Sequence, residues 1–411
     1  MYRIYKSYKC KNCGFHEITE EELWECPKCF STLESYEISS DSIERIKKFS
    51  SQYFSYRDLK ITETGFHFII DSLFYDFETV KKAFDEVGYL PFLSEKEGLK
   101  YLKLMPKPPK GKDNYLLHLG LLIATFATTT MAGYLISQSL VEDGYMENIW
   151  FGALSFSFGL MLILGSHELG HKFAASKSGV DATWPYFIPI PPIIFMLGTL
   201  GAVIRVRSPL PNRDSAIRMG VSGPLVGVLV SIPVLFLGLR LSYPVEITEP
   251  LHGVLQFGEP LLFRIVERFA IQIPENHDLF LHPLAFAGWV GLFVTSLNLI
   301  PIGQLDGGHI LRSFLGEGRY ERTSNKIVGV LILMGVVGYL RELNPAFSFL
   351  PSFWPGWLLW GLIIFLFIGR IKHPGSMNEL QKISSFGRFL AFIALIIFIL
   401  CFIPEPLKFI P

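Results

Sequence analysis

The stretch ALSFSFGLMLILGSHELGHKFAAS, residues 153–176, combines two properties that rarely occur in one segment. It begins as a continuous run of apolar residues, of the kind that lies among lipid chains, and it ends in two histidines and a carboxylate. Ionisable side chains within a membrane are costly and usually serve a function. The stretch therefore predicts a membrane helix that carries a functional polar group near one end.

The composition of the whole chain agrees with a membrane protein. Of its 411 residues, 50% are hydrophobic and 18% are charged, and its mean hydropathy is +0.36. Soluble domains carry about 25% charged residues. The formal net charge is zero, so no overall excess of positive charge indicates a nucleic-acid partner. The polar start, MYRIYKSYKCKNCGFHE, lacks the apolar core of a signal peptide.

Seven apolar segments follow residue 114, and a membrane-spanning helix needs about 20 such residues. The fifth and sixth segments are short, so the sequence predicts six or seven transmembrane helices. The segments cover residues 115–139, 149–172, 215–239, 283–304, 326–341, 355–370 and 386–404.

The charges between these segments predict their orientation, because short cytoplasmic loops collect Lys and Arg. Residues 103–112, 172–218 and 312–326 are rich in basic side chains, whereas residues 140–148 and 241–282 are rich in acidic ones. This alternation predicts an integral protein of the cell membrane, with the N-terminal region on the cytoplasmic side together with the end of the second segment.

Composition also divides the chain into four expected parts. Residues 1–34 are rich in cysteine, residues 35–105 are mixed and polar, residues 106–114 form a linker, and residues 115–404 form the transmembrane part. Within the second part, residues 40–54 and 77–87 have helical spacing, whereas residues 66–71 and 99–105 are typical of strands. The expected fold is a polytopic α-helical membrane protein that carries a small cytoplasmic α+β domain.

The segment DATWPYFIPIPPIIFMLGTLGAVIRVRSPLPNRD, residues 181–214, is apolar but contains too many Pro and Gly residues for one straight helix. Non-helical backbone at membrane depth is tolerated only where protein or a water-filled cavity shelters it. We therefore expect a re-entrant loop and a β-hairpin, with a strand over residues 202–207.

His167 and His171 are four residues apart, so on a helix they share one face, with Glu168 beside them. Two imidazoles in this arrangement can bind a zinc ion, which lowers the pKa of a bound water to about 7, and the carboxylate can then accept the proton of that water. The HExxH pattern thus favours metal-assisted hydrolysis, usually of a peptide bond. The alternative is a histidine pair that only forms hydrogen bonds between helices.

A catalytic zinc needs a third protein ligand, and Asp306 in SLNLIPIGQLDGGHILRS, residues 296–313, is the best candidate. It ends the fourth apolar segment on the side where the second segment ends. His309 is a less favoured alternative ligand, and Asp306 could instead cap a helix. Asn298 could donate a hydrogen bond to the substrate or its oxyanion, or it could form a polar bridge between helices.

Three motifs in this order resemble the site-2 protease family of intramembrane zinc metalloproteases. They are HELGH at 167–171, GTLGAVIRVRSPLPNRDSAIRMGVSGPLVG at 198–227 and NLIPIGQLDGGH at 298–309. The resemblance implies catalytic zinc at His167, His171 and Asp306, with Glu168 as general base, and a membrane-spanning protein segment as substrate. It is nearest to the branch with a long soluble N-terminal region, and the chain has no room for the PDZ domain of many bacterial members.

The resemblance also makes the loop that begins the second motif a candidate substrate site, with Gly198 and Gly201 as its GxxG element. Ile204 and Val206 alternate with basic residues, so an unwound substrate could add to this strand by its edge. The alternative is that the hairpin only shields the site from lipid. We assign Gly223 and Gly227 to helix packing alone.

Two CxxC pairs, Cys10 with Cys13 and Cys26 with Cys29, have the spacing of a zinc ribbon. Such a site holds a structural zinc ion with no open position, and the metal supplies folding energy that so short a segment lacks. We therefore expect two zinc ions per chain. Few basic residues flank the cysteines, so the ribbon favours a protein partner over nucleic acid.

Two other functions compete with an intramembrane protease. One is a membrane-bound zinc peptidase that cuts soluble loops at the membrane surface. The other is a catalytically silent membrane receptor whose zinc ribbon acts as a sensor. Glu168 argues against the silent receptor, since binding zinc does not require it.

Overall fold

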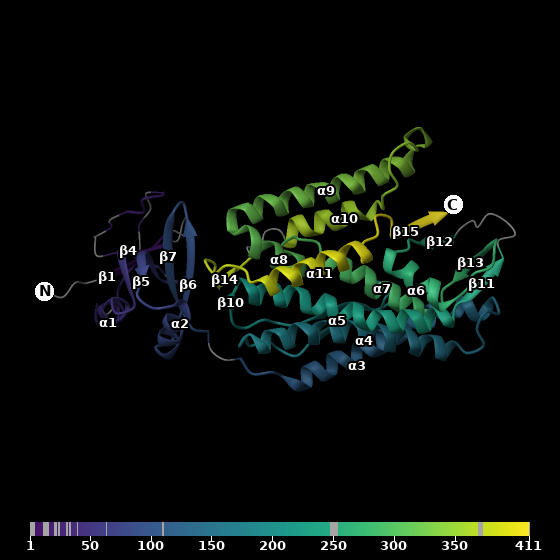
Figure 1. The fold of residues 1–411 in the computed structure, drawn as a ribbon, viewed down its shortest axis with the longest axis horizontal. Helices are drawn as coiled ribbons and strands as arrows, with labels where there is room; N and C mark the ends of the chain where they lie inside the picture. Colours follow the sequence, from purple (N-terminus) through teal and green to yellow (C-terminus); the bar gives the residue numbers. More distant parts are fainter. Residues whose placement is uncertain are drawn as a thin grey trace. The chain divides into compact units, whose positions relative to one another are not determined.

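The computed structural model describes residues 5–10, 16–19, 23, 25–29, 32, 34–38, 40–62, 64–108, 111–246, 254–368 and 373–410 (Figure 1). The chain forms two compact units. The first comprises Met1–Lys110 and Ser376–Lys382, and the second comprises Gly111–Gly375 and Ile383–Pro411. The division of the chain into four parts remains a prediction.

The first unit is a mixed β-sheet with two helices, α1 (Ser40–Ser50) and α2 (Phe77–Glu86). Its strands lie in the order β14-β6-β7-β5-β4-β2-β1-β3. Neighbours are antiparallel except β14, which runs parallel to β6. Their bounds are β1 Tyr5–Lys9, β2 His16–Thr19, β3 Glu34–Ile38, β4 Phe54–Thr62, β5 Gly65–Leu73, β6 Tyr89–Lys96, β7 Leu99–Pro106 and β14 Ser376–Asn378.

The core of this unit follows from the alternation of its strands. In β5 the buried residues are Phe66, Phe68 and Ile70, one position in two, as expected when one face of a strand packs on helices. Phe84 of α2 packs edge-on against Phe49 and is fully buried. The two helices and the two strands predicted for residues 35–105 are confirmed, and so is the α+β fold.

The second unit contains three helices that are long and apolar enough to cross a membrane, within the described part of the chain. They are α3 (Tyr115–Glu142), α4 (Ile149–Lys177) and α5 (Arg213–Arg240). Three shorter apolar helices, Pro283–Asn298, Gly356–Leu366 and Ser385–Cys401, account for further predicted segments. An integral membrane protein is therefore confirmed, whereas the expected total of six or seven spans stays a prediction.

The remaining elements of this unit are shorter or less apolar. The fifth predicted segment lies within α9 (Glu317–Leu343), which begins with several charged residues. The other elements are β8 Tyr186–Pro189, β9 Thr199–Val203, β10 Leu210–Asn212, β11 Tyr243–Glu246, β12 Val254–Phe257, α6 Leu261–Ala270, β13 His277–Phe280, α7 Pro283–Asn298, α8 Asp306–Leu315, η1 Pro345–Phe347, α10 Gly356–Ile363, η2 Ile364–Ile368, α11 Ser385–Cys401 and β15 Leu407–Ile410.

Helix α4 packs against α3, α5 and α7 (Figure 1). Small residues allow this close approach, because a Cβ on Gly133 of α3 would lie 2.6 Å from the carbonyl oxygen of Ala153 in α4. Since α4 has neighbours on several sides, its apolar residues are distributed around the whole helix rather than along one stripe. This packing encloses the C-terminal half of α4, which carries the HELGH motif.

The segment between α4 and α5 forms a hairpin in which β8 pairs with β9, with Phe187 opposite Ala202. The strand expected over residues 202–207 is displaced toward the N-terminus, because β9 ends at Val203. Beyond it, Val206 forms only an isolated bridge with Ala182. Gly198, at φ +74°, lets the turn lie against α3, where a Cβ would approach the carbonyl oxygen of Thr128 to 2.4 Å.

Candidate active site

The two histidines of α4 converge as a helix requires. His167 and His171 are 5% and 6% exposed, and their Nε2 atoms lie 3.1 Å apart. Successive turns of a helix bring side chains at i and i+4 onto one face. The apolar helix thus encloses two imidazole nitrogens that point to one place.

Asp306 reaches the same place from α8, whose first residue it is. Its carboxylate oxygens lie 3.3 Å from Nε2 of His167 and 3.2 Å from Nε2 of His171. One of them, Oδ2, is buried and has no hydrogen-bond partner among the described residues. A buried carboxylate oxygen without a hydrogen bond is costly, which indicates that this site holds a further group.

The geometry fits a metal ion. A tetrahedral zinc with bonds of about 2.0–2.2 Å places its ligand atoms roughly 3.3–3.5 Å apart, close to the separations of the two imidazole nitrogens and the carboxylate oxygens. His171 Nδ1 lies 2.8 Å from the carbonyl oxygen of Met219, to which it donates. This bond fixes the tautomer in which Nε2 is unprotonated and can coordinate a metal.

Glu168 lies beside the two imidazoles and is 9% exposed. A carboxylate oxygen of Glu168 and a ring nitrogen of each histidine lie within 4.8 Å of one another. Its Oε2 accepts a hydrogen bond of 2.9 Å from the backbone N–H of Ile204. The contact leaves Oε1 as the oxygen that can accept a proton.

Asn298, the last residue of α7, is also adjacent to the ligands. Its Nδ2 lies 3.3 Å from Nε2 of His167. The structure thus gathers His167, Glu168, His171, Asn298 and Asp306 around one buried point. It does not bring His309 into this ligand group, because its Nδ1 is engaged 2.8 Å from Nε2 of His373.

Two glycines of α5 make room for the imidazoles. A Cβ on Gly223 would lie 2.1 Å from Nε2 of His171, and one on Gly227 would lie 3.0 Å from Nδ1 of His167. Both glycines pack α5 against α4, and the atoms they approach are those of the candidate ligands. The signal was present in the sequence, since the glycines repeat the spacing of four that separates the histidines.

The four predicted substrate residues lie in different settings. Gly198 packs against α3, and Gly201, at φ +101°, has no atom near its Cβ position. The Ile204 amide contacts Glu168, which sequence reasoning missed because loop geometry cannot be read from periodicity. Val206 is exposed beyond the end of β9.

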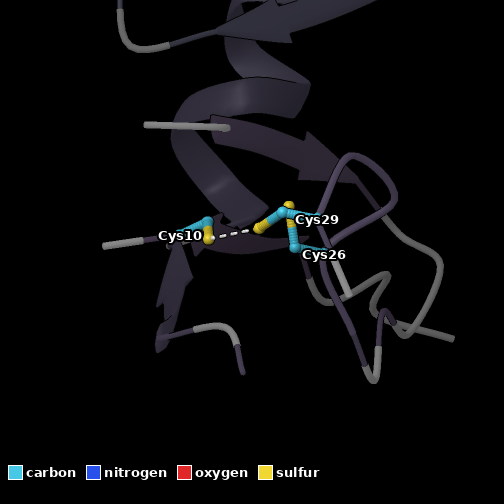
Figure 2. Close-up of side chains that lie close together, drawn as sticks. All are labelled: Cys10, Cys26 and Cys29. Carbon is cyan, nitrogen blue, oxygen red and sulfur yellow. Dashed lines mark hydrogen bonds between the residues drawn. The ribbon is translucent and has the colours of Figure 1, made fainter. Parts of the chain in front are cut away.

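Three of the four N-terminal cysteines lie together (Figure 2). The Sγ atoms of Cys10, Cys26 and Cys29 lie within 4.8 Å of one another, and those of Cys10 and Cys29 are 3.5 Å apart. Cys13 lies outside the described residues. Three converging thiols can serve as metal ligands.

A helical unit that buries two histidines and two carboxylates at one point defines a class of protein, the integral membrane proteins with a candidate metal centre. The comparison with protein families is more specific, since the model of the family described as "Peptidase family M50" matches residues 155–340. This match includes all three motifs, so the resemblance to the site-2 protease family is confirmed for this part of the chain.

Individual relatives agree with this assignment. "Probable zinc metalloprotease EGY1, chloroplastic" of Arabidopsis thaliana is 30% identical over 66% of the chain and 47% of its own length. The protein of the same name from Oryza sativa is 29% identical over 61% of the chain and 41% of its own length. The chain thus spans about half the length of the curated relatives it matches. No solved structure matches the chain.

Proposed function

We propose that the protein is a zinc metallopeptidase that hydrolyses peptide bonds within or near transmembrane segments of other membrane proteins. The convergence of His167, His171 and Asp306 within 3.1–3.3 Å of one another, beside Glu168, carries the proposal. The names of the relatives, which describe zinc metalloproteases, support it. The placement of Glu168 argues against a silent receptor, since a general base is superfluous in a site that only binds metal.

His167, His171 and Asp306 would hold the ion, which when bound supplies the Lewis acidity that makes a water molecule nucleophilic at neutral pH. Glu168 accepts the proton of that water at Oε1, while the Ile204 amide holds Oε2 in place. The same carboxyl group can then pass the proton to the departing amine.

Asn298 orients the substrate in this scheme. Its amide lies at the ligands, 3.3 Å from Nε2 of His167. If that nitrogen held the ion, it would no longer accept a hydrogen bond, and the Asn298 amide would be available to donate to the scissile carbonyl oxygen. Charge develops on this oxygen during attack, and a fixed donor stabilises it.

The substrate backbone would bind along residues 204–206. Thr183 N donates to Arg205 O, and Arg207 N donates to Asp181 O, so these groups form one edge of the extended segment. Backbone groups alternate between the two edges of a strand. Val206 N–H and C=O therefore face the opposite edge, together with the Ile204 amide that reaches Glu168.

This edge supports strand addition by an unwound substrate, with its scissile bond next to the general base. Val206→Pro removes the edge N–H and should reduce cleavage at least ~10-fold, whereas Val206→Ala keeps the backbone and should cleave within about 2-fold of the parent. Equal cleavage by the Pro variant would favour the alternative, a hairpin that only excludes lipid. The assay is cleavage of a transmembrane-segment substrate in proteoliposomes.

The setting of the enzyme follows from the charge pattern. We propose six or seven spans, with the active-site end of α4 and the N-terminal residues 1–105 on the cytoplasmic side of the cell membrane. The relatives are chloroplastic by name, so the comparison supports an integral membrane location in general. The cysteines would hold a second, structural zinc ion in a ribbon that binds a protein partner.

The decisive experiment compares the parent with Glu168→Gln in purified full-length protein. The Gln variant cannot accept the proton, so cleavage should fall by ~10²–10⁴-fold, while zinc content by mass spectrometry stays at the parent level. Glu147→Gln, an exposed acid in the loop between α3 and α4, is the matched control. A Glu168→Gln enzyme that cleaves like the parent would show that Glu168 is not the base.

A further inference from the structure

A second pair of histidines lies at α8, the helix that begins with Asp306. His309 follows Asp306 by three residues on α8, and His373 belongs to the segment that precedes β14. The two rings are nearly perpendicular, at 75°, with centroids 4.5 Å apart. His309 Nδ1 and His373 Nε2 are 2.8 Å apart, the length of a good hydrogen bond.

The protons of this pair can be assigned from its neighbours. The backbone N–H of Gly375 donates to His373 Nδ1 over 3.1 Å, so this nitrogen carries no proton. The proton of His373 is therefore on Nε2, which donates to His309 Nδ1. Since His309 Nδ1 accepts, its own proton is on Nε2. Both rings have one defined tautomer, set by a backbone amide.

The start of α8 is packed too closely for the helix to move freely. A Cβ on Gly220 of α5 would lie 2.6 Å from the Asp306 carbonyl oxygen and 3.2 Å from Cβ of His309. A Cβ on Gly307 would lie 2.0 Å from the Leu299 carbonyl oxygen. The backbone of Asp306 is thus held against α5 and the end of α7, while the His309 ring extends to His373.

Tyr320 of α9 supports the same turn. Its hydroxyl donates to the Gly303 carbonyl oxygen over 2.6 Å, and its ring meets that of His373 edge-on, with centroids 5.8 Å apart. The hydroxyl oxygen would also lie 3.0 Å from a Cβ on Gly308. The pair of histidines is therefore part of a fixed layer around the first turn of α8.

We propose that His309 and His373 are positioning residues for the third metal ligand. Their hydrogen bond fixes the rotation of α8 about its axis, and this rotation sets where the Asp306 carboxylate lies relative to the two imidazoles of α4. Neither residue touches the substrate or the ion. The inference rests on the proposed function, since it assigns Asp306 to the metal.

The test measures zinc retention rather than cleavage, by competition with a chelator in the purified full-length protein. His373→Phe keeps a ring of similar shape but cannot donate, and should lose the zinc of this site at least ~10-fold faster, as is typical of residues that support a ligand. His373→Gln can still donate to His309 Nδ1 and should stay within about 2-fold of the parent. His277→Phe, at a partly exposed histidine of β13, is the control.

Three results would overturn the proposal. They are a folded Phe variant that retains zinc like the parent, a folded Gln variant that loses it as fast as the Phe variant, and effects of His309→Phe and His373→Phe that add fully in the double variant. Folding is checked by thermal melting. The zinc bound at this site is measured as the difference in zinc content between the parent and His171→Ala. If the two proteins contain the same amount of zinc, the proposed function is refuted instead.

Discussion

His167, His171 and Asp306 come from helices that are distant in sequence and enclosed by a larger bundle, whereas Cys10, Cys26 and Cys29 lie close together along a polar segment. The first group is positioned by packing, with glycines of α5 against the imidazoles and Gly220 against the start of α8. The second group has few apolar neighbours of its own, since Tyr8 is the one buried hydrophobic residue besides cysteine in the described part of residues 1–34. We infer that the membrane unit determines its metal site, whereas the metal determines the fold of the cysteine segment.

The largest effect is expected when the candidate ligand on α8, Asp306, is removed. This substitution tests whether the membrane site forms without its metal. Asp306→Ala should lose the zinc of the membrane site and reduce cleavage by more than ~10³-fold, because two imidazoles alone hold zinc poorly. The bundle should still fold, since its packing does not require the ion. Circular dichroism should therefore show the parent helix content, and a loss of helix would contradict a preformed site.

Substitutions at the packing glycines should have the next largest effect. Gly223→Ala places a Cβ 2.1 Å from the ligand nitrogen of His171, and Gly227→Ala places one 3.0 Å from Nδ1 of His167. We expect zinc affinity to fall by at least ~10-fold for Gly223→Ala and by less for Gly227→Ala. Gly120→Ala in α3, where a Cβ would meet nothing within 4 Å, is the matched control for helix propensity.

The cysteine segment, in contrast to the helical bundle, should lose its fold when its zinc ion is removed. Cys26→Ser should remove one zinc ion and raise the hydrogen exchange of residues 5–38 toward that of an unfolded chain, because the metal supplies the folding energy there. Cleavage should change by no more than about 2-fold. Loss of the membrane-site zinc in this variant would contradict the independence of the two groups.

The smallest expected effect concerns the sheet of the first unit. Burial, together with Lys103 and Lys60, lowers the pKa of His67 below its usual value of 6.5. The unfolded chain therefore binds a proton before the folded one, and the stability of β5 should fall as the pH drops below about 6.5. Hydrogen exchange of β5 between pH 7 and pH 5 measures this, and His67→Gln should reduce the dependence.

Much of this organisation could be predicted from local patterns. The HELGH spacing predicts that two imidazoles share one face of a helix. The alternating charge of the loops predicts that Asp306 lies on the same side of the membrane and can join them. Periodicity also gives the two helices of residues 35–105 and the strands β5 and β7, although it does not give β4 or β6. The periodic features depend on residues that are close in sequence, within one helical turn or one pleat of a strand. The loop charges depend on the orientation of the chain in the membrane.

Other features depend on tertiary contacts that no local pattern records. The amide of Ile204 lies at Glu168 because the pairing of β9 with β8 ends at Val203 and the chain continues beside residues 181–183. The sequence predicts a continuous strand there. His373 reaches His309 from the segment between η2 and β14, which no motif marks. The SMN tripeptide of β14 is too short to be recognised as a strand, and only its pairing with β6 reveals it.

That last strand has a consequence for how the protein is made. Met377 of β14 is 2% exposed and belongs to the core that residues 43–104 build, so one strand of an N-terminal sheet is encoded near the C-terminus. At about 5–20 residues per second, translation leaves this sheet incomplete for roughly tens of seconds while the long apolar helices are synthesised. The side of β6 that pairs with β14 therefore lacks its partner until the segment after the apolar helices has been synthesised.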